Sequence, residues 1–325
     1  MAAEDEPKQA RPGRCLAMPG GKPCANKPSP GLPYCRKHAG PLAPKRDLTS
    51  REFLDEWRGS AERAVSRRVN RKPLKANYDE DLVRTLLPFA SPLYRLYWRV
   101  DVEGVENIPN EGPALLASNH SGTLPLDGAM LKVAVLREHG RNPWLLAADL
   151  VFRFPGLREI TRLAGNARAD RGETLDLLRK GELVGVFPEG FKGIGKGWQK
   201  RYQLQRFGRG GFVEMAMETG CPIIPVAIVG AEETYPMIAN ITPLADLFDL
   251  PYFPVTPFFP WLGPLGAIPL PSKWIIGFGE PVPMSHYGAE SADDTQLVLE
   301  ISEGIRQRVQ HMLIELLAKR RSAFL

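Results

Sequence analysis

Short apolar runs alternate with longer amphipathic segments along most of the chain beyond Asp101. The short runs predict buried strands at residues 113–118, 143–147, 182–187, 221–229 and 274–279. Apolar positions at helical spacing predict helices at residues 125–139, 172–180, 209–219 and 293–320. Strands that alternate with helices are typical of an α/β protein, and the near-continuous apolar runs indicate that the sheet is largely buried.

Two helical segments precede this alternating region. Residues 41–77 carry apolar positions at helical spacing in a charged background, which predicts a short amphipathic helix in a linker. From Leu82 the chain reads LVRTLLPFASPLYRLYWRV, with three arginines among apolar and aromatic residues. This composition suits a helix at a membrane interface, and a helix packed on the core fits it equally well. We therefore expect a segment at 1–40, a charged helical linker at 41–80 and the main domain at 81–325.

Residues 250–272 form the longest uncharged run of the chain. The run is long enough to cross a bilayer if it were helical, but it contains seven prolines. Proline interrupts helical hydrogen bonding, and the freed backbone groups would be unpaired in lipid. We therefore expect no transmembrane span here.

The positive charge of the chain is concentrated near its start. Residues 1–80 hold 17 Lys and Arg against 10 Asp and Glu, whereas the remainder of the 325 residues holds 25 against 27. A near-neutral main domain argues against nucleic acid as a partner, because phosphate-backbone binding needs a concentrated positive face. The first residues lack the apolar core of a secretory signal, so we expect a cytoplasmic protein. An anionic membrane surface remains a candidate partner for the basic segment.

Three of the four cysteines lie close together near the start of the chain. Cys15, Cys24, Cys35 and His38 would make a tetrahedral zinc site, and the segment resembles short zinc-knuckle-like modules. So few apolar residues surround these four that the segment would hardly fold without metal. A tail with reduced thiols is the alternative. Cys221 lies in an apolar strand pattern, where a buried inert thiol is expected.

One His and one Asp lie in the turn-rich stretch ASNHSGTLPLDG at residues 117–128. The preceding apolar run predicts a strand, and Pro125 suits the first position of a helix, which puts Asp127 in its first turn. His120 then follows the carboxyl end of a strand, where open α/β sheets bind ligands. Asp127 would hold one imidazole nitrogen and leave the other free to take a proton from a hydroxyl. A lone loop His is more often structural.

A second cluster follows the predicted strand at 182–187, in the sequence LVGVFPEGFKGIGKGW. Its glycine-rich backbone and basic side chains suit phosphate. These basic residues are Lys192, Lys196, Lys200 and Arg201. Gly190 to Lys196 also fits the spacing of a nucleotide-binding P-loop, but Gly197 replaces the Ser or Thr that binds magnesium, so we set ATP aside.

Two further segments carry candidate chemistry. In GNARADR, the arginines lie close to a predicted helix start and suit fork-like binding of an anion. In CPIIPVAIVG, two prolines interrupt an apolar strand, which favours an edge position or a sharp turn into the strand.

Taken in order, SNHSGTLPLD, GNARADR, VFPEG and CPIIPVAIVG resemble the four sequence blocks of the glycerolipid acyltransferase superfamily, which includes the glycerol-3-phosphate and lysophosphatidic acid acyltransferases. The resemblance covers roughly residues 100–285, and VFPEG with the proline-containing strand is its most specific part. The run from FPEG to FGRGGF is also similar to a bacterial branch related to diacylglycerol acyltransferases. The resemblance implies an acyltransferase-type α/β fold with a mixed, largely parallel sheet flanked by helices.

The resemblance also implies acyl transfer from acyl-CoA or acyl carrier protein to a glycerolipid hydroxyl, with a lysophosphatidic acid-like acceptor favoured. His120 would be the general base and Asp127 would fix its tautomer, with amides of the NHSG loop stabilising the oxyanion. The family usually has four residues between this His and Asp, whereas six intervene here. The residues implied in substrate binding are Asn119, Ser121, Arg168, Arg171, Pro188, Glu189, Gly190, Lys192 and Pro225.

Catalysis of this kind needs no cofactor beyond the donor, so zinc would be structural. The implied partners are the donor, the lipid acceptor and a membrane surface, with the protein peripheral or monotopic on the cytoplasmic face. The proline-rich run would dip into the membrane interface or line the path of the acyl chain, or form a packed loop. A lipid hydrolase using the same site and a non-catalytic lipid-binding protein are the alternatives. No GxSxG surrounds any serine, which argues against a serine hydrolase.

Overall fold

A seven-stranded sheet lies at the centre of the computed structural model, which describes residues 58, 59, 61, 78–153 and 157–324. The strand order is β1-β9-β6-β2-β5-β3-β4, and all neighbours are parallel except β6 and β9. The strands are β1 (Asp101–Glu103), β2 (Ala114–Ser118), β3 (Pro143–Ala147), β4 (Asn166–Arg168), β5 (Leu183–Val186), β6 (Ile223–Val229) and β9 (Ile275–Phe278). The mixed, largely parallel α/β sheet is therefore confirmed.

The five predicted strands correspond to β2, β3, β5, β6 and β9, with bounds that differ by at most two residues. Within the seven-stranded sheet, the strands without a prediction are β1 and β4, which have three residues each and lie at its two edges. Such short strands leave no periodic pattern, and β4 falls inside the GNARADR segment that we interpreted through its arginines.

The helices agree with the prediction over most of their length. The four predicted helices are α4 (Leu126–Ala134), which continues as a π-helical turn at Val135–His139, α7 (Arg171–Arg179), α9 (Gly211–Thr219) and α11 (Thr295–Lys319). The further helices are α3 (Glu80–Pro92) with a π-helical turn at Leu93–Tyr97, α5 (Asp149–Arg153), α6 (Leu157–Leu163), α8 (Phe191–Ile194) and α10 (Thr242–Leu247).

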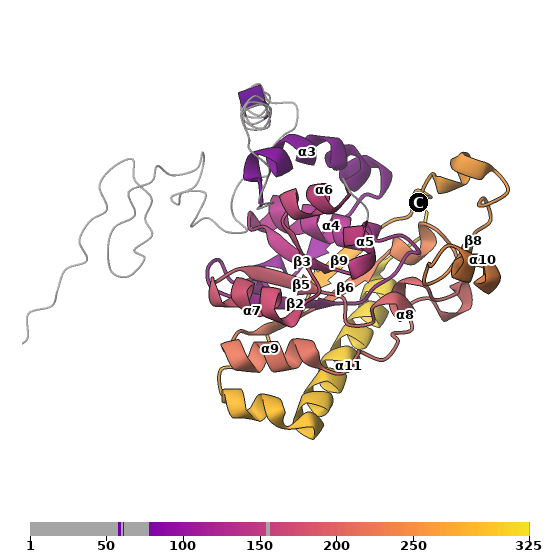
Figure 1. The fold of residues 1–325 in the computed structure, drawn as a ribbon. Coiled ribbons are helices and arrows are strands. Elements are labelled where there is room, and N and C mark those ends of the chain that lie inside the picture. The colour runs from indigo at the N-terminus through magenta and orange to yellow at the C-terminus, as the bar shows by residue number, and fades with distance from the viewer. Residues whose placement is uncertain (1–57, 60, 62–77, 154–156, 325) are drawn as a thin grey trace, which may run out of the picture.

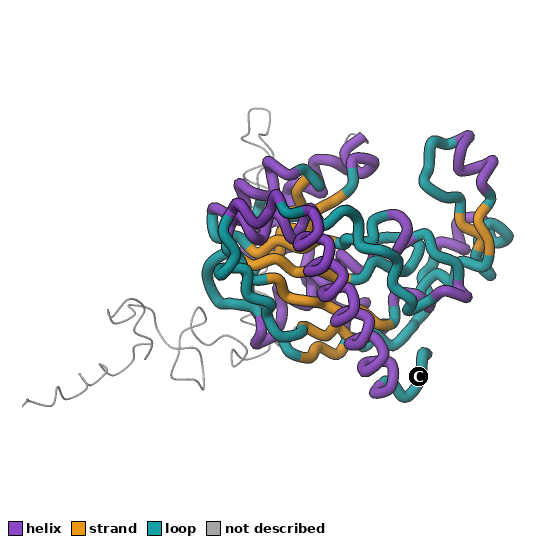
Figure 2. The backbone as a smooth tube through the Cα atoms, turned by 90° about the horizontal axis from the view of Figure 1, so that it is seen from below, coloured by secondary structure: helices purple, strands orange, loops and turns teal. Residues whose placement is uncertain are grey.

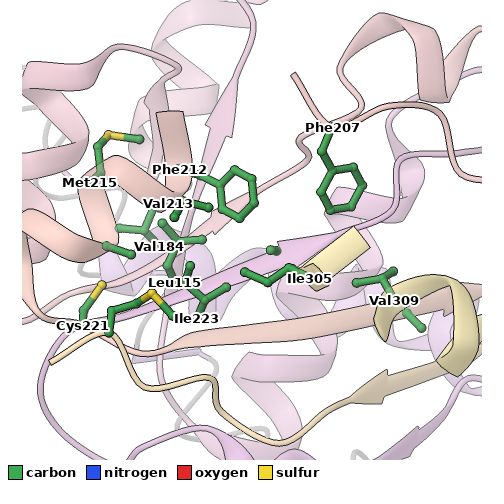
Figure 3. Close-up of a cluster of buried hydrophobic side chains, with 14 of the residues drawn as sticks. Leu115, Val184, Phe207, Phe212, Val213, Met215, Cys221, Ile223, Ile305 and Val309 are labelled. Carbon is green, nitrogen blue, oxygen red and sulfur yellow. The ribbon is translucent and has the colours of Figure 1, made fainter. Parts of the chain in front are cut away.

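Helices α7, α9 and α11 cover one face of the sheet, and the long α11 crosses beneath the strands (Figures 1 and 2). Their apolar stripes pack on alternate strand residues and form the larger of two buried clusters. Figure 3 shows Leu115 and Ile223 of the strands with Val213 of α9 and Ile305 of α11. Cys221 is buried in the same cluster as a free thiol, and burial raises its pKa, as expected for an inert cysteine.

Helices α3 and α4 cover the opposite face. The turn that follows α3 contributes Tyr94 and Trp98 to the second buried cluster, where the Trp98 and Trp274 rings lie 5.1 Å apart. Other apolar residues of the same segment face outward, and Phe89 and Leu96 are 67% and 76% exposed. One side of the segment therefore packs on the core, and the interpretation of the segment as a helix at a membrane interface stays a prediction.

The position of β6 corrects one prediction. The prolines of CPIIPVAIVG favoured an edge strand or a sharp turn into the strand, and the edge alternative is wrong because β6 lies between β2 and β9. Pro222 directly precedes the first residue of β6, where the second alternative placed a proline. Pro225 is tolerated there because its position on the β9 side lies just beyond Phe278, the last residue of β9. The Gly279 N–H donates to the Pro225 carbonyl at 2.8 Å, and the N–H that proline lacks would face Gly279, which lies outside β9.

Residues between β6 and β9 form an arm that projects from the body of the molecule (Figures 1 and 2). The arm contains α10 and a small antiparallel sheet of β7 (Ala239–Asn240) and β8 (Pro254–Val255). Its exposed apolar side chains are Ile238, Leu247, Phe248, Phe258, Trp261, Leu262, Leu265 and Ile268. The uncharged run at 250–272 is thus not one helix, and none of the helices in the described part of the chain has the length and apolarity to cross a membrane.

The predicted zinc ligands, Cys15, Cys24, Cys35 and His38, lie outside the described residues, as does nearly all of the helix predicted at 41–77. The zinc site and the division of the chain at residues 40 and 80 therefore stay predictions.

Candidate active site

The carboxyl ends of three adjacent parallel strands meet at one edge of the sheet. His120 follows β2, Glu189 follows β5, and Glu232 follows β6. Because parallel strands end together, side chains that are far apart in sequence gather here, which is where ligands bind in open α/β sheets. The predicted position of His120 at the end of its strand is confirmed.

The His120 ring is held by Asp127. Its Nδ1 atom lies 2.7 Å from the Asp127 Oδ2 atom, and the carboxylate is fully buried while the imidazole is 15% exposed. A carboxylate accepts only, so Nδ1 carries the proton of a neutral imidazole and Nε2 keeps its lone pair. Among the described residues Nε2 has no hydrogen-bond partner. The ring also lies against Phe187, with centroids 4.5 Å apart. The arrangement suits proton transfer at Nε2.

The loop between His120 and Asp127 folds back on itself, which accommodates the six intervening residues. Gly122 and Thr123 both adopt left-handed backbone conformations, with φ of 95° and 65°. A Cβ atom on Gly122 would lie 2.6 Å from the Ala231 carbonyl oxygen, so only glycine fits this approach. Asp127 lies in the first turn of α4, as predicted, although the helix begins at Leu126, one residue after Pro125.

Thr123 anchors the same loop to the rest of the molecule. Its N–H donates to Ile194 of α8, and its hydroxyl donates to the Tyr235 carbonyl at 2.8 Å. The Tyr252 hydroxyl, from the projecting arm, donates to the Thr123 carbonyl. Burial raises the pKa of this phenol, and the Asp127 carboxylate adds to the effect. The phenol therefore stays protonated as a donor, and the arm is joined directly to the loop that carries His120.

Glu189 supports the His120 backbone from the other side. Its Oε1 atom accepts the His120 N–H at 2.9 Å, and its Oε2 atom accepts the Gln205 N–H at 2.6 Å. The carboxylate is buried, and both of its oxygens are used within the protein. Glu189 thus positions the histidine loop in this structure, and the glycerol-binding role that the resemblance implies stays a prediction.

A buried lysine links Glu189 to a second acidic residue. The Lys196 ammonium lies 3.6 Å from Glu189 Oε2 and 3.1 Å from Glu232 Oε1, and all three side chains are shielded from solvent. Burial raises the pKa of Glu232 to about 7, which Lys196 opposes only in part. The cluster therefore approaches neutrality by holding a proton on Glu232.

The neighbouring Glu233 belongs to a related group. It accepts the Tyr202 hydroxyl and forms an ion pair with Arg320, at 2.8 Å from its Oε1 atom. Sequence reasoning missed both glutamates. The available signal was GAEETY, because two adjacent carboxylates directly after a buried strand must be paired if they lie inside the fold.

Two of the four NHSG amides, for which an oxyanion role was predicted, are engaged within the protein. The His120 N–H donates to Glu189, and the Ser121 N–H donates to Asp127 Oδ2 at 2.8 Å. These two donors hold His120 and Asp127 in place, so neither is directed at a substrate oxygen, and an oxyanion role for the remaining amides of the loop stays a prediction.

The remaining predicted binding residues of this loop are buried. The Asn119 amide accepts from the Ile228 N–H at 2.7 Å and donates to the Ile228 carbonyl at 3.0 Å. It therefore positions β6 beside the end of β2. The Ser121 hydroxyl is buried and has no hydrogen-bond partner among the described residues. The buried Pro225 pairs with Ala117 in the sheet.

The FPEG block turns outward beside this loop. Pro188 is half-buried and accepts the Gly208 N–H, while Gly190 has a φ of 55° and is exposed at the start of α8. Lys192 follows on α8 and is also exposed. A substrate that reaches His120 from this side would meet these residues first.

The two predicted arginines lie farther from His120. Arg168 ends β4, three strands from β2, which at strand spacing is roughly 14 Å. It is exposed and pairs with Asp149 at 2.6 Å. Arg171, at the start of α7, pairs with Glu214 and Glu218 of α9. The structure therefore does not bring either arginine into contact with His120 or Asp127.

Comparison with known proteins agrees with this geometry. Residues 99–229 match the acyltransferase family model. An uncharacterized protein of Mycobacterium tuberculosis is 50% identical over 250 residues, covering 76% of this chain and 69% of that protein. A DGAT1/2-independent enzyme synthesizing storage lipids from Gallus gallus is 27% identical over 189 residues, covering 58% of this chain and 54% of that enzyme.

A solved structure shares the fold. The crystal structure of the 1-acyl-sn-glycerophosphate (LPA) acyltransferase PlsC from Thermotoga maritima matches with a TM-score of 0.52 at 18% identity, covering 83% of this chain and 96% of that chain.

Proposed function

Since the chain belongs to the acyltransferase family, we propose that it moves a fatty acyl group from a thioester, acyl-CoA or acyl carrier protein, to a hydroxyl of a glycerolipid. The observation that carries this proposal is the 2.7 Å contact between His120 Nδ1 and Asp127 Oδ2 at the carboxyl edge of the sheet. It leaves Nε2 as a base in a half-open site, and a base is what an alcohol acceptor requires.

The reaction proceeds without a covalent enzyme intermediate. Nε2 of His120 takes the proton of the acceptor hydroxyl as its oxygen attacks the thioester carbonyl carbon. The tetrahedral intermediate then expels the thiolate, which receives the proton from the imidazolium. Asp127 keeps the proton on Nδ1 throughout and stabilises the imidazolium, and base assistance of this kind contributes about 10²–10⁴-fold.

A lysophosphatidic acid-like acceptor is the favoured substrate. The structurally similar PlsC is an LPA acyltransferase, and the avian relative synthesises storage lipids, so both kinds of acceptor have a precedent among similar proteins. Lys192 is exposed on α8, beside the loop of His120, and is the cation available for an acceptor phosphate. Arg171 is engaged by two glutamates and would have to leave them to bind one.

The protein would act at the cytoplasmic face of a membrane. The apolar side chains of the arm and the outward side of the α3 segment supply the surface for this attachment. The arm and the α3 segment lie next to each other. The Tyr97 hydroxyl donates to the Pro269 carbonyl, and the Trp98 indole N–H donates to the Leu270 carbonyl at 3.0 Å. Tyr252 then connects the attached arm to the histidine loop.

The test is release of free thiol from long-chain acyl thioesters by the purified full chain, with a panel of phosphorylated and neutral glycerol acceptors. Thiol release that requires one acceptor, together with the acylated product in mass spectra, supports transfer and names the acceptor. Release at the same rate without any acceptor identifies a hydrolase instead. Vesicle binding without any release identifies a lipid-binding protein that does not catalyse.

A further inference from the structure

Thr123 has an unfavourable backbone conformation in the loop between His120 and Asp127. Its φ of 65° lies in the left-handed region, and it is the only β-branched residue among the non-glycine residues that adopt a positive φ in the described part of the chain. A β-branched residue is strained in this region, and such a conformation persists only where the surroundings fix it. Contacts outside the loop must therefore hold Thr123 in place.

The three polar groups of Thr123 are all bonded to other segments. Its N–H donates to the Ile194 carbonyl of α8 at 3.2 Å, and its hydroxyl donates to the Tyr235 carbonyl at 2.8 Å. Its carbonyl accepts the Tyr252 hydroxyl. Thr123 is buried, so water does not replace these partners. Two of the three partners, Tyr235 and Tyr252, belong to the arm.

Tyr252 is fixed between the arm and α8. Its ring leaves no room for a side chain at Gly195, where a Cβ atom would lie 2.7 Å from the Tyr252 Cδ1 atom. The next residue, Phe253, packs within the arm, with its ring centroid 6.1 Å from that of Phe248 and 5.8 Å from that of Phe259. The Tyr252 hydroxyl therefore reaches the histidine loop from a backbone that the aromatic residues of the arm hold.

Tyr235 depends on the arm as well. Its hydroxyl donates to the Ala267 carbonyl at 2.6 Å, so this residue connects the beginning of the arm to its end. A change in the position of the arm would therefore act on the hydroxyl and the carbonyl of Thr123 together.

The strained residue lies close to the contact between His120 and Asp127. The Asp127 Oδ2 atom accepts the Ser121 N–H at 2.8 Å, and the same oxygen lies 2.7 Å from His120 Nδ1. Only Gly122 separates Ser121 from Thr123, so relaxation of the Thr123 backbone would move the Ser121 N–H away from the carboxylate. A loop with six residues between His120 and Asp127 has more freedom than a shorter one, and Thr123 anchors it near its middle.

We propose that Tyr252 is a positioning residue for acyl transfer: its hydroxyl holds Thr123 in the left-handed conformation, and Thr123 keeps the loop on the course that places Asp127 against His120. The inference rests on the proposed function. Because Tyr252 belongs to the arm, the placement of the arm becomes a condition for the chemistry and not only for attachment to a membrane.

Tyr252→Phe removes the hydroxyl alone. With a short-chain, water-soluble donor and acceptor, we expect a kcat about tenfold lower at an unchanged KM, because the hydroxyl is used within the protein and a small displacement of a base has an effect of this size. The matched control is Tyr97→Phe. It removes another phenol hydroxyl that binds a backbone carbonyl of the arm, that of Pro269, without touching the histidine loop, and it should leave kcat unchanged.

A second background tests whether Tyr252 acts through the strain of Thr123. Asparagine tolerates the left-handed conformation, is close to threonine in size and offers a side-chain donor to the Tyr235 carbonyl. In the Thr123→Asn protein there is little strain left to oppose, so Tyr252→Phe should lower kcat only about twofold or less.

Modification of His120 by diethyl pyrocarbonate, followed by mass spectrometry, needs no turnover. The imidazole is 15% exposed, and a released loop would expose it further, so Tyr252→Phe should raise its rate of modification about threefold or more. His311, whose side chain is 75% exposed on α11, is the internal reference and should react equally in both proteins. Faster modification of His120 in this variant, when the wild type transfers no acyl group, would contradict the proposed function and leave the positioning role intact.

Three results would overturn the positioning role. The first is an unchanged kcat or an unchanged rate of His120 modification in Tyr252→Phe. The second is an equal loss of kcat in Tyr97→Phe, which would make the effect a general one of the arm. The third is a loss of full size that persists in the Thr123→Asn background.

Discussion

The Asn119 side chain hydrogen bonds to both backbone polar atoms of Ile228 and so continues the pairing of β2 and β6 beyond Ser118, the last residue of β2. Since parallel strands need evenly spaced partners, a side-chain amide here replaces the backbone that has turned away toward His120. Asn119 therefore connects the end of β6 to the start of the loop that carries His120.

Replacing Asn119 should weaken the whole edge of the sheet. Asn119→Ala leaves the Ile228 N–H and carbonyl buried without these partners, so the free energy of unfolding should fall by about 2 kcal/mol or more. Asn119→Asp keeps the acceptor for the N–H and should lose less if its carboxyl group is protonated. Urea denaturation measures the free energy of unfolding of both variants. An alanine variant as stable as the wild type would show that the backbone of Ile228 does not need the Asn119 side chain as a hydrogen-bond partner.

Substitutions at two glycines with the same backbone conformation distinguish the effect of backbone strain from the effect of a steric clash. Gly122→Ala and Gly140→Ala share a left-handed φ, at 95° and 89°, so both variants should lose about 1 kcal/mol of stability. Only the Gly122 substitution also meets a carbonyl oxygen, since nothing lies within 4 Å of a Cβ atom on Gly140. We expect at least a tenfold lower kcat for Gly122→Ala alone. Equal kcat values in the two variants would mean that the loop between His120 and Asp127 can shift to accommodate the added methyl group without a loss of activity.

The buried Glu232 should make stability depend on pH. Its folded-state pKa of about 7 lies above the ordinary value of 4.5, so between these values the folded protein binds a proton that the unfolded chain has released. Stability should therefore fall as the pH rises from 4.5 to 7, by on the order of 2–3 kcal/mol. Glu232→Gln should flatten this part of the profile. The exposed Glu106→Gln is the control, and parallel profiles for the two variants would contradict the assignment.

Attachment to membranes should depend on the tip of the arm. Trp261 and Leu265 are 71% and 64% exposed, and replacing both with Gln should reduce sedimentation with phospholipid vesicles several-fold. Activity on a short-chain, water-soluble donor and acceptor should persist, because neither residue borders His120. Ile314→Gln is the matched control, since this exposed apolar residue lies on α11. Equal loss of vesicle binding in both proteins would argue against a specific surface.

The sequence predicted those strands and helices whose pattern of apolar residues is long enough to be recognised. Buried strands such as β2 and β6 consist of consecutive apolar residues, and α11 carries one continuous apolar stripe. The position of Pro225 in a central strand was not predictable, because it depends on where β9 ends, fifty residues later in the chain. Local preference favours an edge for proline, and only the tertiary pairing decides otherwise.

The contact between His120 and Asp127 was predictable because both residues belong to one strand–loop–helix segment. The environment of Arg171 was not, since its partners Glu214 and Glu218 lie on a helix whose packing on α7 no local pattern reveals. The same holds for Lys196, which looked like one more phosphate ligand in a basic loop. Its burial between Glu189 and Glu232 depends on two strand ends that meet only in the folded sheet.

The most direct test of the account is the rate of acyl transfer by His120→Ala, measured with the acceptor that the wild type prefers. The side chain is removed while the backbone bond to Glu189 is retained, so the melting temperature should change little. We predict a kcat lower by about 10²–10⁴-fold, the contribution of a positioned base. A folded His120→Ala protein that transfers acyl groups at the wild-type rate would contradict the assignment of His120 as the base.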